Sequence, residues 1–107
     1  MVDYTLSPFA AEQVTAIYDY SLENWGEAQA KKYLNGLIGM FFRIAEGKSL
    51  SHPIKPIFKV SGFYTRYEKH FIYWKILKNG NLGIFAVLHQ QQNQGDRLAE
   101  ALKIPFG

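Results

Sequence analysis

The feature that most constrains the fold of this chain is the Asn79-Gly80 dipeptide, which stands between two apolar segments. Asn and Gly tolerate the positive φ angles of a two-residue type I′ turn, so the dipeptide predicts a β-hairpin. The turn sets the register, and the expected opposed pairs are Lys78–Asn81, Trp74–Phe85, Ile72–Val87 and His70–His89. Because side chains alternate between the faces of a sheet, one face is expected to hold Ile72, Trp74, Phe85 and Val87, with both histidines at its end.

Length and composition indicate a single soluble domain spanning residues 1–107. The chain is 48% hydrophobic and 16% aromatic, which is enough to build one core. It contains no cysteine, which excludes disulfides and thiolate chemistry. No apolar run approaches the ~20 residues of a membrane span, and no signal sequence follows Met1, so a cytoplasmic protein is expected. The net charge of +3 favours an acidic partner, but the scattered lysines do not indicate sequence-specific DNA binding by the chain alone.

The N-terminal half predicts a short strand followed by two helices. Val2 to Leu6 is the strand, and Ser7-Pro8 is a typical helix start. Apolar residues at helical spacing continue to Gly26, where a second helix begins at Glu27 and runs to Gly47. The short link requires an antiparallel helical hairpin. Helical spacing also predicts that Trp25, Tyr18 and Tyr33 belong to the core.

The C-terminal half predicts an antiparallel sheet and a last helix. Lys48 to Ser61 is expected to be a loop, with extended structure around Ile57 to Val60. The predicted strands are Phe63–Tyr67, His70–Leu77 and Leu82–Leu88, and the predicted helix is Asp96–Lys103. The third strand is apolar on both faces, which indicates a strand covered on each side. The predicted class is therefore α+β: a short strand and a helical hairpin packed on a small antiparallel sheet, with a short C-terminal helix over the other face.

Four strings, in this order and spacing, resemble the ParE branch of the RelE/ParE toxins of bacterial toxin–antitoxin systems. They are Ser7-Pro8-Phe9-Ala10-Ala11-Glu12; Ile17-Tyr18-Asp19-Tyr20 with Trp25-Gly26-Glu27-Ala28-Gln29-Ala30; Arg66-Tyr67 with His70-Phe71-Ile72-Tyr73-Trp74; and Val87-Leu88-His89. The chain departs from many relatives around the last string, where Ala86 stands in place of an arginine before it and Gln90-Gln91 stands in place of Gly-Arg after it. The turn before His70 is also shorter.

The resemblance implies a non-enzymatic toxin without cofactors that binds DNA gyrase, through its A subunit, and traps the cleaved-DNA state. It also implies a ParD-like antitoxin with a ribbon-helix-helix part and a flexible tail. Two alternatives stay open. One is a RelE-like ribosome-dependent mRNA endonuclease, for which the available residues are Arg66, Lys69, Tyr73 and His89. The other is a non-toxic module that still binds an antitoxin, which the missing arginines suggest.

The opposed histidines are the pair of side chains best suited to metal binding or acid–base chemistry in the chain. Zinc needs a third ligand, and no other His, Cys or carboxylate has ligand spacing, so neither a metal site nor a catalytic residue is predicted. Arg66 is expected near the pair, where its planar guanidinium suits phosphate or carboxylate recognition. Pairing with Glu68 or with a carboxylate of a helix, for structure alone, is the alternative. The predicted target-binding residues are Arg66, His70, His89, Gln90 and Gln91. The predicted antitoxin-binding residues are Tyr18, Leu22, Tyr33, Leu98, Leu102 and Phe106.

Overall fold

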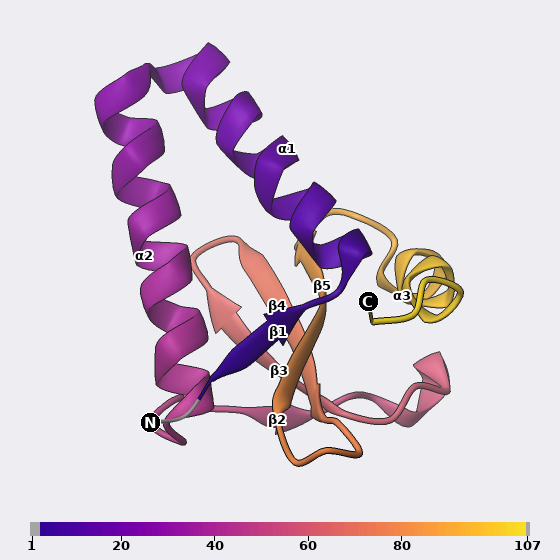
Figure 1. Ribbon diagram of the computed structural model, residues 1–107. Coiled ribbons are helices and arrows are strands. Elements are labelled where there is room, and N and C mark those ends of the chain that lie inside the picture. Colours follow the sequence, from indigo (N-terminus) through magenta and orange to yellow (C-terminus); the bar gives the residue numbers. More distant parts are fainter. Residues whose placement is uncertain (1–2, 107) are drawn as a thin grey trace.

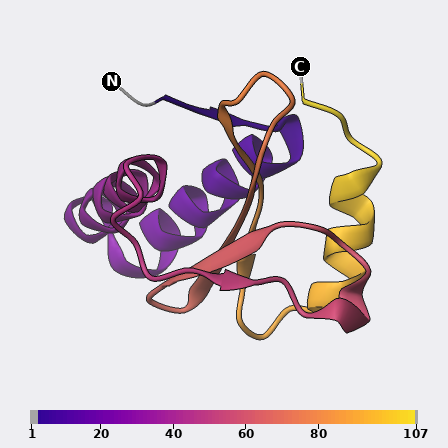
Figure 2. The same ribbon diagram turned by 90° about the horizontal axis from the view of Figure 1, so that it is seen from below.

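A computed structural model describes residues 3–106 of the chain. The elements, in chain order, are β1 (Tyr4–Leu6), α1 (Pro8–Trp25), α2 (Glu27–Ala45), β2 (His52–Pro53), η1 (Pro56–Phe58), β3 (Phe63–Tyr67), β4 (His70–Ile76), β5 (Leu82–His89) and α3 (Gln94–Leu102). The α1–α2 hairpin lies on one side of the sheet and α3 on the other (Figures 1 and 2). This confirms the predicted α+β class. None of the helices within residues 3–106 is long and apolar enough to cross a bilayer.

The sheet has five strands in the order β1-β5-β4-β3-β2, and it is mixed rather than purely antiparallel. β1 runs parallel to β5, while the β5–β4, β4–β3 and β3–β2 pairs are antiparallel. The N-terminal strand therefore extends the sheet at its β5 edge. As its composition predicted, β5 is an inner strand, and every residue from Leu82 to Leu88 is buried.

Two hydrophobic cores follow from this layering, one on each face of the sheet. The core beneath the helical hairpin contains Ala10, Leu37, Phe41, Ile44, Ile72, Leu82, Ile84 and Val87. The core beneath α3 contains Phe9, Ile54, Tyr73, Phe85, Ala86, Leu88, Leu98 and Ala101. Both faces of β5 are thus removed from water. Burial of apolar surface of this kind is the dominant favourable contribution to folding.

The helix boundaries follow the predicted capping signals. The Ser7 hydroxyl accepts a hydrogen bond from the backbone N–H of Ala10 at 3.0 Å, and Pro8 occupies the first helical position. Gly26, with φ of 87°, ends α1 and begins α2, so the two helices meet at one residue. The predicted N-terminal strand is present from Tyr4 onward, and Val2 lies outside the described residues.

The predicted extended segment at Ile57 to Val60 is wrong. Pro56–Phe58 forms a short 3-10 helix, because proline at position 56 presets the φ angle of a first helical turn. Lys59 then adopts a left-handed conformation, and the strand of this region is instead His52–Pro53. The last helix starts two residues earlier than predicted, at Gln94, where the Asn93 side chain caps it by accepting from the Asp96 N–H.

The β4–β5 turn differs from the predicted type I′ turn. The Gly80 N–H donates to the Leu77 carbonyl at 2.9 Å, and the Leu77 N–H donates to the Asn81 carbonyl at 2.8 Å. Gly80 has φ of 89°, whereas Asn79 is not among the non-glycine residues with positive φ. The loop is therefore a three-residue one, a type I turn followed by a glycine bulge.

This longer loop shifts the register by one residue near the turn, so Trp74 opposes Ile84 rather than Phe85. A β-bulge between Tyr73 and Trp74 then takes up the extra residue, Phe85, which turns to the α3 side of the sheet. Beyond the bulge the predicted register is restored. Ile72 opposes Val87 and His70 opposes His89, because the two deviations cancel.

Candidate functional site

The two histidines meet at the end of β4 and β5, on the face that carries the helical hairpin. His70 and His89 are directly opposed, and their ring centroids lie 5.2 Å apart in an edge-to-face arrangement. Within residues 3–106, no group of three or more His, Cys, Asp and Glu side chains is placed to hold a metal ion. The pair therefore has to be understood through its hydrogen bonds.

Tyr33 of α2 ties the helical hairpin to this corner. Its hydroxyl lies 2.6 Å from His70 Nδ1, and its ring packs edge-to-face on Tyr67 at 5.3 Å. Burial raises the pKa of Tyr33 to about 12, with the acidic neighbours Tyr67 and Glu68 adding to the effect and a hydrogen bond to the Lys69 backbone opposing it. The hydroxyl is thus protonated at neutral pH and is able to donate to His70.

His70 is uncharged at neutral pH. Burial, followed by the proximity of His89, lowers its pKa from the usual 6.5 to about 4. Since Nδ1 accepts from Tyr33, the remaining ring hydrogen lies on Nε2. His89 Nδ1 accepts a hydrogen bond from the Gln91 backbone N–H at 3.1 Å. The neutral His70 ring, bonded to Tyr33, and the His89 ring, bonded to the Gln91 backbone, are therefore both held in place by hydrogen bonds.

Arg66 lies at the same end of the sheet but on the other face. In the β3–β4 register Tyr67 opposes His70 while Arg66 opposes Phe71, so strand alternation separates the guanidinium from the histidine pair. The Arg66 Nη2 donates to Gln90 Oε1 at 2.9 Å and Nε donates to the Glu68 carbonyl at 2.8 Å. The predicted grouping of Arg66 with the histidines is therefore wrong, although Arg66 does meet Gln90. Gln91, the next residue along the chain, is exposed.

The outer end of the helical hairpin presents aromatic side chains to solvent. Figure 1 shows α1 and α2 extending together past the sheet, so the residues around Gly26 have no layer beneath them. Trp25 is 61% exposed and packs edge-to-face on Tyr20, which is 59% exposed. The prediction that Trp25 belongs to the core is wrong, because helical spacing does not show where a helix leaves the sheet. Tyr18 is half-buried and Leu22 is 40% exposed.

The residues predicted near the C-terminus divide between core and surface. Leu98 lies on the inner face of α3, is fully buried and is a core residue, so it is not available as a contact surface. Leu102 is 52% exposed, and Phe106 is half-buried. The ammonium of Lys75 lies 5.5 Å from the ring centre of Phe85 and 6.0 Å from that of Phe106. A small cavity of about 230 Å³ here is lined by Lys75, Phe85, Ala101, Leu102, Ile104, Pro105 and Phe106.

Residues 4–94, most of the chain, match the sequence profile of a family described as the ParE toxin of the type II toxin–antitoxin system parDE. The chain belongs to the ParE toxin family. Among curated relatives, Toxin ParE of Escherichia coli is 26% identical over 103 residues, which are 96% of this chain and 99% of that protein. The resemblance of the four sequence strings is thereby confirmed.

Solved structures of toxin–antitoxin systems share the fold of this ParE-family chain. The chromosomal ParDE system of P. aeruginosa contains a chain that aligns with a TM-score of 0.64 at 16% identity, covering 83% of this chain and 96% of that one. The YoeB-YefM complex of Staphylococcus aureus gives a TM-score of 0.52 at 17% identity, covering 83% and 97%. The ParE and YoeB-type structures thus have the same layered architecture.

Proposed function

We propose that this ParE-family toxin acts by binding DNA gyrase and trapping its cleaved-DNA state, without an enzymatic activity of its own. The match to the ParE family over residues 4–94 is the observation that carries the proposal. The chemistry of the histidine corner supports it. His70 is held neutral with a pKa of about 4, its Nδ1 is bonded to Tyr33, and Arg66 lies on the opposite face. General acid–base catalysis favours groups whose pKa lies near the working pH and that reach the same substrate. His70 and Arg66 do not have this arrangement, because the pKa of His70 is too low and Arg66 is on the other face of the sheet.

The proposed gyrase contacts are at the end of the sheet where β3, β4 and the loop after β5 meet. They are Arg66, His70, His89, Gln90 and Gln91. The Arg66 guanidinium is exposed, is held by Gln90 and Glu68, and lies with its Cζ 5.9 Å from the ring centre of Phe71. A cation held at the surface in this way is pre-organised for an acidic group of the target.

We also propose that a ParD-like antitoxin silences the toxin by laying an amphipathic segment along the helical hairpin and the C-terminal region. Trp25 and Tyr20 expose large apolar areas at the hairpin end, as anchors for such a segment would. The proposed contacts from the sequence prediction that remain accessible are Tyr18, Leu22, Tyr33, Leu102 and Phe106.

Purified toxin mixed with gyrase, ATP and supercoiled DNA tests the gyrase proposal directly. Linear cleaved DNA is expected to accumulate. Arg66→Gln should lower the yield, whereas Lys78→Gln, which removes an exposed cation from the β4–β5 loop, is a matched control that should leave it unchanged. No cleaved DNA at a large excess of folded toxin over gyrase would contradict the proposal.

A second candidate is cleavage of mRNA on the ribosome, for which the shared architecture with the YoeB-YefM structure is the favouring observation. Codon-specific cleavage of mRNA in a translation extract would establish it and replace the gyrase proposal. Expression of the chain alone in bacteria separates both from an inert module. Filamentous growth with DNA-damage signalling indicates gyrase poisoning, and normal growth indicates a chain that only binds its antitoxin.

A further inference from the structure

A seam between α1, β5 and α3 contains two buried hydrogen-bond donors that are not used by the fold. They are Gln13 Nε2 and Arg97 Nε, and among residues 3–106 neither atom has an acceptor. Buried polar atoms are almost always hydrogen-bonded, so two unpaired donors in one seam call for a physical explanation. Neither Gln13 nor Arg97 is among the proposed gyrase or antitoxin contacts.

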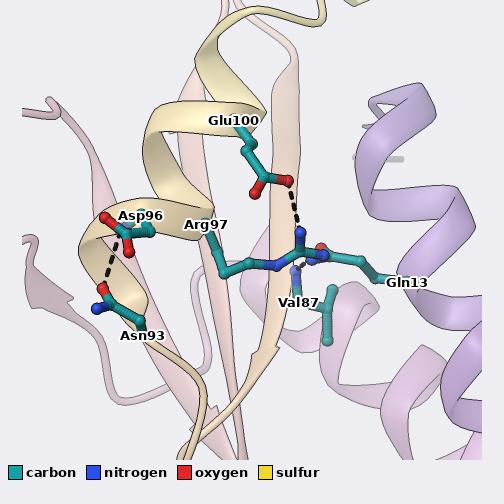
Figure 3. A network of polar contacts seen from close by, with 6 residues as sticks. All are labelled: Gln13, Val87, Asn93, Asp96, Arg97 and Glu100. Atoms are coloured by element: carbon teal, nitrogen blue, oxygen red, sulfur yellow. Dashed lines mark hydrogen bonds and ion pairs between the residues drawn. The ribbon is translucent and has the colours of Figure 1, made fainter.

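Gln13 is held in place by the edge of the sheet. β1 pairs with β5 only as far as Leu6 and Ile84, so the outer edge of β5 is uncovered beyond that point. The Gln13 Oε1 accepts from the Val87 backbone N–H there at 2.7 Å (Figure 3). That bond orients the carboxamide, because its oxygen must face Val87 and its NH₂ group must face away. Gln13 is only 8% exposed, so the unused NH₂ group points into the seam.

Arg97 of α3 enters the seam from the opposite side. Its guanidinium carbon lies 5.1 Å from the ring centre of Phe9, which is one helical turn before Gln13 on the same face of α1. Its Nη1 is paired with Glu100 of the same helix, and its side chain is 32% exposed. Figure 3 shows the guanidinium reaching from α3 toward Gln13 and Val87. One end of the fork is therefore engaged, and the buried Nε is not.

We propose that this seam is a carboxylate-binding site, in which Arg97 donates from Nε and Gln13 donates from Nε2 to one bound carboxylate. Arginine presents parallel N–H groups that match the two oxygens of a carboxylate, and the buried surroundings strengthen such bonds. The seam supplies positive charge from Arg97 and a pre-oriented neutral donor from Gln13. The ligand is either a free small carboxylate or the acidic side chain of a protein partner, and both share this chemistry.

Glu100 competes with such a ligand for the guanidinium. Its carboxylate already accepts from Arg97 Nη1, yet its side chain is 52% exposed and can turn toward solvent. An exposed pair of this kind contributes little free energy, so its replacement by an external carboxylate is not strongly opposed.

Titration of the full chain with sodium formate tests the site, with sodium chloride at the same ionic strength as the reference. The side-chain amide signals of Gln13 and the Nε–H signal of Arg97 in ¹H–¹⁵N spectra should shift and saturate with formate. Glu100→Gln removes the competitor and should tighten binding roughly two- to fivefold, which is the factor set by an exposed ion pair. Arg97→Lys keeps the charge but removes the fork, and it should abolish the shift at Gln13.

Gln13→Glu provides an independent variant. Its carboxylate can accept from both Val87 and Arg97, so it occupies the place of the ligand, and the chain should lose its response to formate while melting at a higher temperature. Acetyl-Ala-Glu-Ala-amide and its Gln counterpart distinguish the two sources. Binding of the Glu peptide supports an acidic side chain, and binding of formate alone supports a free small carboxylate. If neither formate nor the peptide shifts the Gln13 signals beyond chloride in the folded wild type and Glu100→Gln, the proposal is wrong.

Discussion

Gly36, in the middle of α2, faces Tyr67 of β3, and its replacement by alanine tests how the helix is held against the sheet. A Cβ added at Gly36 would overlap the Tyr67 hydroxyl and lie 2.9 Å from its Cζ, so the tyrosine ring has to move. Gly39, one turn away on the same helix, has open space at the corresponding position. The two glycines therefore form a matched pair that differs in what the new methyl group meets.

The expected magnitude follows from two opposing effects. Alanine in a helix interior is more favourable than glycine by about 1 kcal/mol at either position. Moving the ring of Tyr67 gives up its contact with Tyr33, which is worth about 0.5–1.5 kcal/mol, and overpacking as a whole costs about 1–3 kcal/mol. Gly39→Ala should thus stabilise the fold by about 1 kcal/mol, while Gly36→Ala should destabilise it by about 0–2 kcal/mol.

Urea denaturation followed by far-ultraviolet circular dichroism gives both free energies of unfolding. The propensity gain cancels between the two variants, so their difference of about 1–3 kcal/mol measures the steric cost alone. In a Tyr67→Phe background the hydroxyl is gone and that difference should fall by half or more. A rise in stability for Gly36→Ala equal to that for Gly39→Ala would refute the described packing of α2 on β3.

Three further outcomes are expected. His70 has a pKa of about 4 in the folded state and near 6.5 in the unfolded chain, so its contribution to stability should be constant above pH 6.5 and fall as the pH drops toward 4. His70→Asn should reduce that fall in a pH series of urea denaturations, and an unchanged slope would count against the neutral histidine. Ser7→Ala removes a buried helix cap bonded to Ala10 and should cost about 1–2 kcal/mol in the same assay, whereas a loss below a few tenths would mean that the cap is not formed. Trp25→Ala should change the free energy of unfolding by less than about 0.5 kcal/mol, because the side chain is 61% exposed. It should speed dissociation of the antitoxin in surface plasmon resonance, and an unaltered dissociation rate would exclude Trp25 from that interface.

Local signals in the sequence were sufficient for most of the elements. Ser7-Pro8 and Gly26 predicted the ends of α1 because capping depends on one or two residues and on φ angles that only some residues tolerate. The double-sided burial of β5 was predictable in the same way, since seven consecutive residues with almost no polar group cannot face water. The His70–His89 pairing also followed from the hairpin, although only because the loop and bulge deviations cancelled.

The sites were less predictable because they depend on which elements lie beside one another. Nothing in the sequence around Tyr33 indicates that its hydroxyl meets His70, a residue 37 positions away. Nothing in the sequence of α2 indicates that Gly36 leaves room for the hydroxyl of Tyr67, a residue of β3. The separation of Arg66 from the histidines depended on strand alternation within a register that the sequence alone left open.

The sequence by itself determined the set of elements and their order, because helix caps, turns and apolar periodicity act over a few residues. It also determined the family, because the four strings resemble ParE toxins in their order and spacing. Only the tertiary structure decided that Trp25 faces solvent, that Leu98 is buried, and that Gln13 and Arg97 share a seam. Those outcomes depend on where each helix stops being covered by another layer. Packing between distant segments sets that point, and no local pattern encodes it.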